Sequence, residues 1–147
     1  MAKPRDDGSS VRKARAAGLR STRQRAAIVD ALRGASGFKT AQDLHFELVR
    51  SGERVGLTTV YRNLQTLANA KEIDVLLTAS GETMYRLCSV DDHHHHLVCR
   101  QCGLSFEISA EEVEAWADRV ARRHGFKHVS HTAEIFGSCQ ECLAAGS

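Results

Sequence analysis

No stretch of this 147-residue sequence holds the roughly eighteen consecutive apolar residues that a membrane-spanning helix requires. The N-terminal segment "MAKPRDDGSSVRKARAAGLRS" is basic but has no apolar core behind it, so it does not look like a secretory signal. Internal repeats are also missing. We therefore expect a cytoplasmic protein of one ordinary domain or two small lobes. Thiols stay reduced in the cytoplasm, so the five cysteines indicate metal or redox chemistry before disulfides.

The net charge is only +2, but it is distributed unevenly. Residues 1–87 hold 15 basic and 9 acidic side chains, whereas residues 88–147 hold 5 basic and 9 acidic ones. All five cysteines and seven of the eight histidines lie in the second part. The positive excess lies near the N-terminus. Residues 1–15 form a basic arm. In most proteins such an arm is disordered or is a helix with one solvated face, and the more specific interpretation is an arm that binds the DNA backbone.

The first part has three helix patterns followed by a hairpin pattern. Ser21 begins a capping box before "RQRAAIVDALRG", and Thr40 opens a second helix, "AQDLHFELVRSG", which stops at Gly52. A third helix is expected from about Thr58, and its buried stripe consists of Val60, Leu64 and Leu67. In residues 73–87 the apolar side chains Ile73, Val75 and Leu77 alternate before a Ser-Gly turn, and Tyr85 and Leu87 alternate after it, which predicts a hairpin.

Three short helices and a hairpin are the elements of a winged helix-turn-helix, in which the third helix enters the DNA major groove. Arginine pairs with guanine edges, and threonine hydroxyls suit phosphates at a helix N-terminus. The candidate DNA contacts are Thr58, Thr59, Tyr61, Arg62, Gln65 and Arg23. The alternative is a merely solvated helix face, because residues 26–87 hold seven basic and seven acidic side chains and form no basic stripe.

The pattern after residue 88 is strand, helix, strand. The segment "HHHLVCRQCGLSFEI" predicts two short strands around a Cys-x-x-Cys turn, and "HVSHTAEIFGSC" predicts a returning strand. Ser109 begins another capping box, which opens a helix that ends near Gly125. The side chains expected to face inward from this helix are Val113, Trp116, Val120 and Ala121.

Two Cys-x-x-Cys pairs provide four thiolates, and each pair can present two sulfurs to one ion. The four residues are Cys99, Cys102, Cys139 and Cys142. Four thiolates form the closed tetrahedral shell of structural zinc, whereas a thioredoxin-like redox pair is the alternative. Zinc is favoured because a lobe of about 60 residues buries too little apolar surface to be robust alone.

Four consecutive histidines precede the first of these turns. They are internal and number four, so they do not resemble a terminal six-histidine tag. Side chains alternate on a strand, so His93 and His95 should point one way and His94 and His96 the other, which gives half of two metal sites. The candidate partners are Cys88 and Asp74 on one side and His128, His131, Glu111, Glu112 and Glu114 on the other. Spacing alone does not choose among the three glutamates.

A winged helix with "TTVYRNLQTL", then a histidine-rich strand and two Cys-x-x-Cys pairs, resembles the ferric uptake regulator superfamily. Within it, "LTTVYR", "HHHHLVC" and "HTAEIFG" are most similar to the zinc uptake regulators of actinobacteria. The resemblance covers residues 15–142. It implies an α+β fold with an N-terminal winged-helix DNA-binding domain, residues 1–87, and a small α/β metal-binding dimerisation domain, residues 88–147. It also implies a homodimeric repressor that binds palindromic operators when its metal is loaded.

The same resemblance implies up to three zinc sites. The four cysteines match the structural site. The regulatory site is matched by Asp74, Cys88, His94 and His96, and a further site by His93, His95, Glu114 and His131. Tyr61 and Arg62 match the pair that contacts DNA. Since Asp74 begins the wing and Cys88 ends it, zinc in the regulatory site would fix the angle between the two lobes.

Several alternatives remain at the level of the sequence. A sulfur ligand at Cys88 favours zinc over iron, but a sensor of iron or nickel shares the fold. A passive zinc-binding protein would leave the helix-turn-helix without a purpose. A zinc hydrolase needs an open coordination position, which four protein ligands do not leave. We therefore expect double-stranded DNA and a second copy of the chain as partners, no enzymatic activity, no membrane and no small-molecule substrate.

Overall fold

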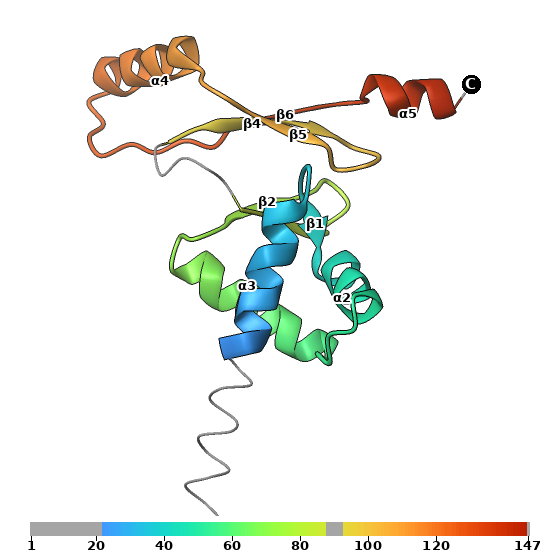
Figure 1. Cartoon of the computed structure of the whole chain (residues 1–147). Coiled ribbons are helices and arrows are strands. Elements are labelled where there is room, and N and C mark those ends of the chain that lie inside the picture. Colours follow the sequence, from blue (N-terminus) through green and yellow to red (C-terminus); the bar gives the residue numbers. More distant parts are fainter. Residues whose placement is uncertain (1–21, 88–92, 147) are drawn as a thin grey trace, which may run out of the picture.

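The computed structural model describes residues 22–87 and 93–146 and has the predicted α+β fold class (Figure 1). Within these ranges no helix is both long enough and apolar enough to cross a membrane. The predicted basic arm, the Ser21 cap and Cys88 lie outside the described residues. The boundary predicted between residues 87 and 88 falls at the edge of the segment 88–92 and stays a prediction.

The first half is built on three helices. The first is helical over the described residues 22–34, α2 spans Ala41–Arg50 and α3 spans Leu57–Asn69. The capping box at Thr40 is confirmed, because its hydroxyl accepts the Asp43 N–H at 3.1 Å while the Asp43 carboxylate accepts the Thr40 N–H. The predicted stripe is confirmed as well: the buried residues of α3 are Val60, Leu64 and Leu67.

The predicted hairpin is confirmed as β2 (Asp74–Leu77) and β3 (Thr83–Arg86), which pair antiparallel. A short strand that the sequence did not reveal, β1 (Lys39–Thr40), pairs with β3 and completes a three-stranded sheet. From β2 the buried side chain is Leu76, at 5% exposed, whereas Val75 and Leu77 are 50% and 68% exposed. The alternation of apolar residues predicted the hairpin but not its buried face, and the face with Leu76 packs against the second half of the molecule.

The second half contains another three-stranded sheet. Strand β4 (His95–Cys99) lies between β5 (Ser105–Ile108), which runs antiparallel to it, and β6 (Glu134–Gly137), which runs parallel. The helix α4 (Glu111–Arg123) connects β5 with β6, and a short helix, α5 (Gln140–Ala145), follows. The sequence predicted the strands and α4, but not α5.

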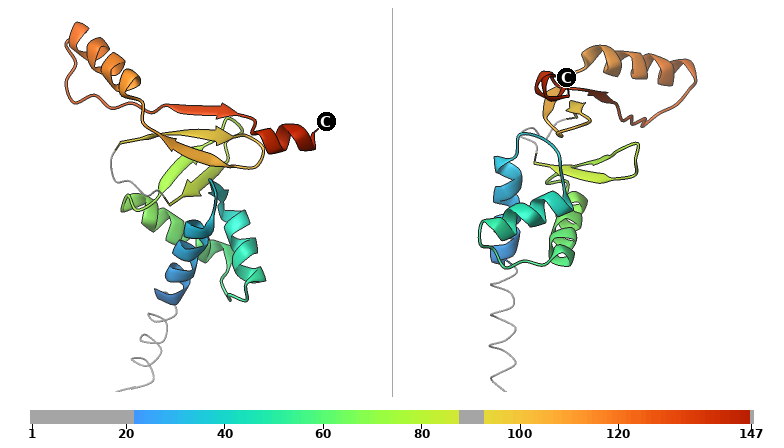
Figure 2. Two further views of the ribbon diagram at one scale, coloured as in Figure 1. Left: turned by 45° about the horizontal axis from the view of Figure 1, so that its top comes forward. Right: turned by 90° about the vertical axis from the view of Figure 1, so that its right-hand side faces the viewer.

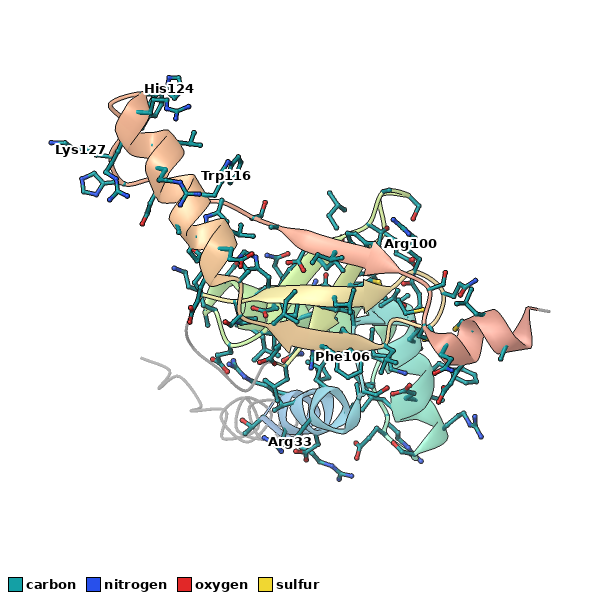
Figure 3. The ribbon with its side chains drawn as sticks, turned by 90° about the horizontal axis from the view of Figure 1, so that it is seen from above. Arg33, Arg100, Phe106, Trp116, His124 and Lys127 are labelled. Carbon is teal, nitrogen blue, oxygen red and sulfur yellow. The ribbon has the colours of Figure 1, made fainter. Side chains whose placement is uncertain are left out.

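Two details of α4 differ from the prediction. Ser109 does not form a capping box: the N-cap is Ala110, without a side-chain hydrogen bond. Of the four side chains expected to face inward only Ala121 is buried, and Trp116 is 59% exposed. The physical reason is visible in Figures 2 and 3, in which α4, with its Trp116, projects beyond the two sheets.

The two halves meet along a seam between the sheets. In Figure 1 the first sheet lies between the three helices and the second sheet. A small apolar cluster joins the sheets, with Phe38, Leu76 and Met84 from one side and Val98 and Phe136 from the other. Beside this cluster, the chain after the first helix forms main-chain contacts with the turn between β4 and β5.

Those main-chain contacts require two glycines. The Phe38 N–H donates to the Gly103 carbonyl at 3.0 Å, and Gly37 forms an isolated antiparallel bridge with Leu104. A Cβ added at Gly37 would lie 1.9 Å from the Gly103 oxygen, and Gly103 itself has a φ of +76°. Neither backbone can retreat without opening the seam, so the close approach depends on the missing side chains.

Gly37→Ala is expected to separate the two halves, because the added methyl group displaces the Gly103 carbonyl. Overpacking of this kind costs about 1–3 kcal/mol. Small-angle scattering should show a larger radius of gyration, and the thermal midpoint should fall. Gly34→Ala is the matched control, since a Cβ there meets nothing within 4 Å. A wild-type scattering curve for Gly37→Ala would show that the seam does not hold the halves together.

Candidate metal sites

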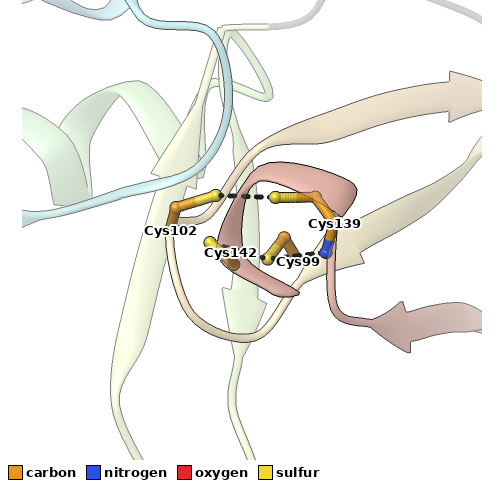
Figure 4. A group of neighbouring side chains, drawn as sticks. All are labelled: Cys99, Cys102, Cys139 and Cys142. Carbon is orange, nitrogen blue, oxygen red and sulfur yellow. Dashed lines mark hydrogen bonds between the residues drawn. The ribbon is translucent and has the colours of Figure 1, made fainter. Parts of the chain in front are cut away.

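The four cysteines predicted from spacing are brought together at one end of the second sheet (Figure 4). Cys99 is the last residue of β4 and Cys102 lies in the turn before β5, while Cys139 caps α5 and Cys142 lies within it. The unpredicted helix α5 thus has a clear role, because it turns both sulfurs of the second pair toward the first.

The sulfur positions have the dimensions of a tetrahedral metal shell. The Cys99 and Cys142 sulfurs are 3.9 Å apart, and those of Cys102 and Cys139 are 3.7 Å apart. Four sulfurs at the usual zinc–sulfur distance of about 2.3 Å lie about 3.8 Å from one another. A disulfide requires about 2.05 Å, and all four cysteines are free.

The pKa values of two of these cysteines indicate that the cluster needs a cation to become four thiolates. Backbone N–H groups of Cys102, Cys139 and Gln101 hydrogen-bond to the Cys99 sulfur and lower its pKa to about 6. Hydrogen bonds with the Cys139 and Cys102 thiols instead raise the pKa of Cys142 to about 12. Four neighbouring sulfurs therefore do not all lose their protons by themselves, and a divalent metal supplies the charge that stabilises four thiolates.

A second cluster lies entirely within the second half and consists of His93, His95, Glu114 and His131. One carboxylate oxygen of Glu114 lies 2.8 Å from His95 Nε2, 3.0 Å from His131 Nε2 and 3.1 Å from His93 Nε2. The hydrogen bond from His95, followed by that from His131, lowers the pKa of the Glu114 carboxyl. Among the described residues, Glu111, Glu112 and His128 belong to none of the clusters.

A third cluster joins the two halves of the molecule. Asp74 is the first residue of β2, whereas His94 and His96 come from the histidine run of the second half. The Asp74 carboxylate oxygen lies 2.7 Å from His94 Nε2 and 3.2 Å from His96 Nε2. The expected fourth ligand, Cys88, lies outside the described residues. The run of four histidines is thus divided between two clusters, as the alternation of side chains along a strand predicted.

The hydrogen bonds at Nδ1 of His95 and of His96 indicate whether the other ring nitrogen can bind a cation. His95 Nδ1 lies 2.9 Å from the Ala133 carbonyl, which can only accept, so this nitrogen carries a proton. Nε2, which lies 2.8 Å from Glu114, is then the His95 nitrogen that a cation could bind in place of its proton. His96 has the same arrangement, with Nδ1 3.1 Å from a Glu134 carboxylate oxygen and Nε2 facing Asp74. Imidazole nitrogens beside carboxylates are a ligand set that a cation would bind in place of the protons between them.

The candidate DNA contacts lie on two helices of the first half. Among them Thr58, Tyr61, Arg62 and Gln65 are exposed on α3, and Thr59 is half-buried. Arg23 lies on the first helix and is exposed, although it approaches Glu53 at 3.6 Å. These side chains surround the polar face of a helix whose opposite face is buried, so they are free to approach a large partner.

Sequence reasoning missed Glu134. Its carboxylate touches His96, and it lies in the "HTAEIFG" segment, where nothing in the local pattern marks it. Only the pairing of β6 with β4 places it there, and that pairing joins residues 38 positions apart.

A winged-helix half joined through a wing to a sheet with three ligand clusters defines a class of metal-binding regulators. The chain belongs to the ferric uptake regulator family, whose sequence profile matches residues 16–136. It is 58% identical to the zinc uptake regulation protein of Mycobacterium tuberculosis over 127 residues, which cover 86% of this chain and 97% of that relative.

Two solved structures are informative neighbours. The crystal structure of FurB from M. tuberculosis, a zinc uptake regulator, is 58% identical, covers 86% of this chain and 98% of its own, and superposes with a TM-score of 0.54. The ferric uptake regulator of Helicobacter pylori, described with three functional metal-binding sites, is 26% identical, covers 82% of each chain and superposes with a TM-score of 0.65. The more similar sequence therefore superposes less closely.

Proposed function

We propose that this protein is a zinc-responsive transcriptional repressor whose zinc-loaded homodimer binds palindromic operators of zinc uptake and homeostasis genes in the cytoplasm. It releases the DNA when zinc is scarce. The observation that carries the proposal is the cluster of Asp74, His94 and His96, because its ligands come from both halves of the chain. A metal site built in this way depends on how the halves are placed relative to each other. The 58% identity to a zinc uptake regulation protein supports zinc as the metal.

Three zinc ions per chain are proposed. The four-cysteine cluster is the structural site, and Asp74, Cys88, His94 and His96 are the ligands of the regulatory site. The cluster around Glu114 is the third site, and the three metal-binding sites described for the H. pylori relative support this number. Imidazole and thiolate together suit zinc, whereas iron sensors favour nitrogen and oxygen.

The exposed face of α3 is proposed to read the operator. Tyr61 and Arg62 contact DNA from its centre, the arginine through a guanine edge. Thr58 and Thr59 stand in the first turn of α3, whose N-cap is Gly56 without a side-chain hydrogen bond, so main-chain N–H groups are available to phosphate there. Gln65 and Arg23 extend the same surface. A dimer presents two such helices to successive major grooves.

The second half is proposed to form the dimer. Among the described residues 93–146 only three apolar side chains are buried, those of Val98, Cys99 and Ala121. The exposed large apolar residues there are Leu97, Phe106, Trp116, Val120, Phe126, Val129, Ile135 and Leu143. An apolar surface of this kind is typical of a protein–protein interface. A second copy of the chain, related by two-fold symmetry, buries the same face on both partners.

The proposed switch follows from the position of the regulatory ligands. Asp74 can share one ion with His94 and His96 only when the wing lies against the second sheet, as it does along the seam. A divalent cation at this cluster supplies the positive charge that the facing carboxylate and Nε2 lone pairs lack. The lower TM-score of the more identical neighbour supports halves that can take different relative positions, because chains of such identity share the fold of each part.

DNA binding measured under buffered metal tests this function. Fluorescence anisotropy of promoter fragments from the protein's own genome should show tight, saturable binding that appears only as free zinc rises. Arg62→Ala should weaken that binding by about 1–3 kcal/mol and relax sequence preference at one position. Binding that follows Fe(II) instead would assign the protein to an iron-sensing branch. Specific binding at no metal level would favour a passive zinc-binding protein.

A further inference from the structure

Glu134, the first residue of β6, is placed by strand pairing directly opposite His96. The two residues are partners in the parallel ladder between β6 and β4. One oxygen of the Glu134 carboxylate accepts the main-chain N–H of His96 at 3.1 Å and lies 3.1 Å from the ring Nδ1. The other oxygen lies 3.3 Å from the same nitrogen. None of the three ligand clusters contains Glu134.

We propose that Glu134 is the positioning residue of the regulatory site, which holds His96 in the state that binds metal. A carboxylate accepts hydrogen bonds, so Glu134 holds a proton on Nδ1 and turns Nε2, 3.2 Å from Asp74, toward the cluster as the nitrogen that is available to a metal. This inference rests on the proposed function of that cluster. Carboxylates that orient a ligating histidine also make it a stronger ligand, and their loss weakens metal binding about 10–100-fold.

The neighbouring histidine shows that this arrangement is specific to one site. His95 Nδ1 donates to the Ala133 carbonyl, whereas His96 Nδ1 donates to the Glu134 carboxylate. Two consecutive residues therefore orient two consecutive histidines, which belong to different clusters. A neutral carbonyl fixes the ring only, but a carboxylate also adds negative charge behind it. His96 is thus a stronger electron donor to its metal than His95 is.

His96 keeps other contacts if Glu134 is replaced. Its ring is 4% exposed and packs edge-on against Phe38, with the two ring centroids 5.0 Å apart. Phe38 belongs to the first half, and β4 is held by β5 on its other side. If the Glu134 carboxylate is removed, the proton of the His96 ring should no longer be held on Nδ1. The ring itself should stay in the cluster.

Glu134→Ala and Glu134→Gln, made in the full chain with its four-cysteine site loaded, test the proposal. Long-range ¹H–¹⁵N correlation spectra, recorded without further zinc, report which nitrogen of His96 carries the proton. The wild type should show a proton held on Nδ1, and Glu134→Ala should show a fraction of rings whose proton is on Nε2 alone. Competition with a chromophoric chelator should show zinc affinity of the regulatory site reduced about 10–100-fold in Glu134→Ala. Glu134→Gln, whose amide oxygen still accepts, should restore the tautomer and part of the affinity.

Glu112→Ala is the matched control, because it removes an exposed carboxylate of the second half that belongs to no cluster. It should leave both readouts unchanged. A wild-type tautomer and affinity in Glu134→Ala would overturn the proposal, as would equal losses in Glu134→Ala and Glu134→Gln. The tautomer is measured without zinc in the regulatory site, so it tests Glu134 independently. The same zinc affinity in the wild type and in Asp74→Ala would instead refute the proposed function of the cluster.

Discussion

Asp74→Ala is expected to abolish the effect of zinc on operator binding. Asp74 is the only described ligand of the regulatory cluster that comes from the first half. Without it His94 and His96 can still hold an ion, but that ion no longer ties the wing to the second sheet. A switch from 1:99 to 99:1 in favour of the DNA-binding arrangement requires about 5.5 kcal/mol of differential binding. If that difference is lost, operator affinity in saturating zinc falls about 100-fold.

The matched control exchanges a carboxylate for alanine in the other histidine cluster. Glu114→Ala removes the ligand shared by His93, His95 and His131, all of which belong to the second half. That cluster does not join the halves, so Glu114→Ala should weaken zinc binding at the third site but leave the zinc-dependent switch in place. Anisotropy titrations of both variants with the same operator, at fixed free zinc, make the comparison. Wild-type zinc dependence in Asp74→Ala would disprove the proposal that zinc at this cluster ties the two halves together. Cys88→Ser tests the same proposal from the other end of the wing.

Cys102→Ser is expected to unfold the second half of the chain. The first half has its own core around Ile28, Leu44 and Leu64, but the second half buries few apolar side chains. Structural zinc contributes about 10–16 kcal/mol of apparent binding free energy in small zinc domains, and that energy is coupled to folding. Loss of one thiolate removes most of it. The turn that holds Gly103 against Phe38 is lost as well, so the halves should separate.

Circular dichroism, size-exclusion chromatography and zinc analysis measure the unfolding of the second half in Cys102→Ser. Cys102→Ser should lose the structural zinc ion and, because ligands of the other two sites lie in the same half, the remaining zinc as well. It should also lose strand signal and dissociate from dimer to monomer, while the three helices of the first half stay folded. Gln101→Ala is the control in the same turn, because its side chain is exposed while its backbone N–H still bonds to the Cys99 sulfur. A folded dimer with full zinc content after Cys102→Ser would show that the four cysteines do not form a structural site.

Local spacing by itself determined much of this protein. The Thr40 capping box, the buried stripe of α3 and the two chelating turns follow from backbone geometry within a few residues, and the structure contains them. The division of the histidine run between two clusters follows from the twofold period of an extended chain. The approximate extent of the helices and strands was available for the same reason, because caps and periodicity act over single turns.

Tertiary structure decided which faces are buried and which residues distant in the sequence come into contact. Leu76 is buried instead of Val75 and Leu77 because the far sheet covers the other face of the wing. Spacing left three glutamates open, and the geometry brings only Glu114 to His131. Glu134 reaches His96 through a parallel pairing across 38 residues, and no local pattern encodes such a register. The apolar stripe of α4 was read as core, but a single chain leaves Trp116 exposed. Periodicity reports that a face is to be buried, and only the packed molecule shows which surface buries it.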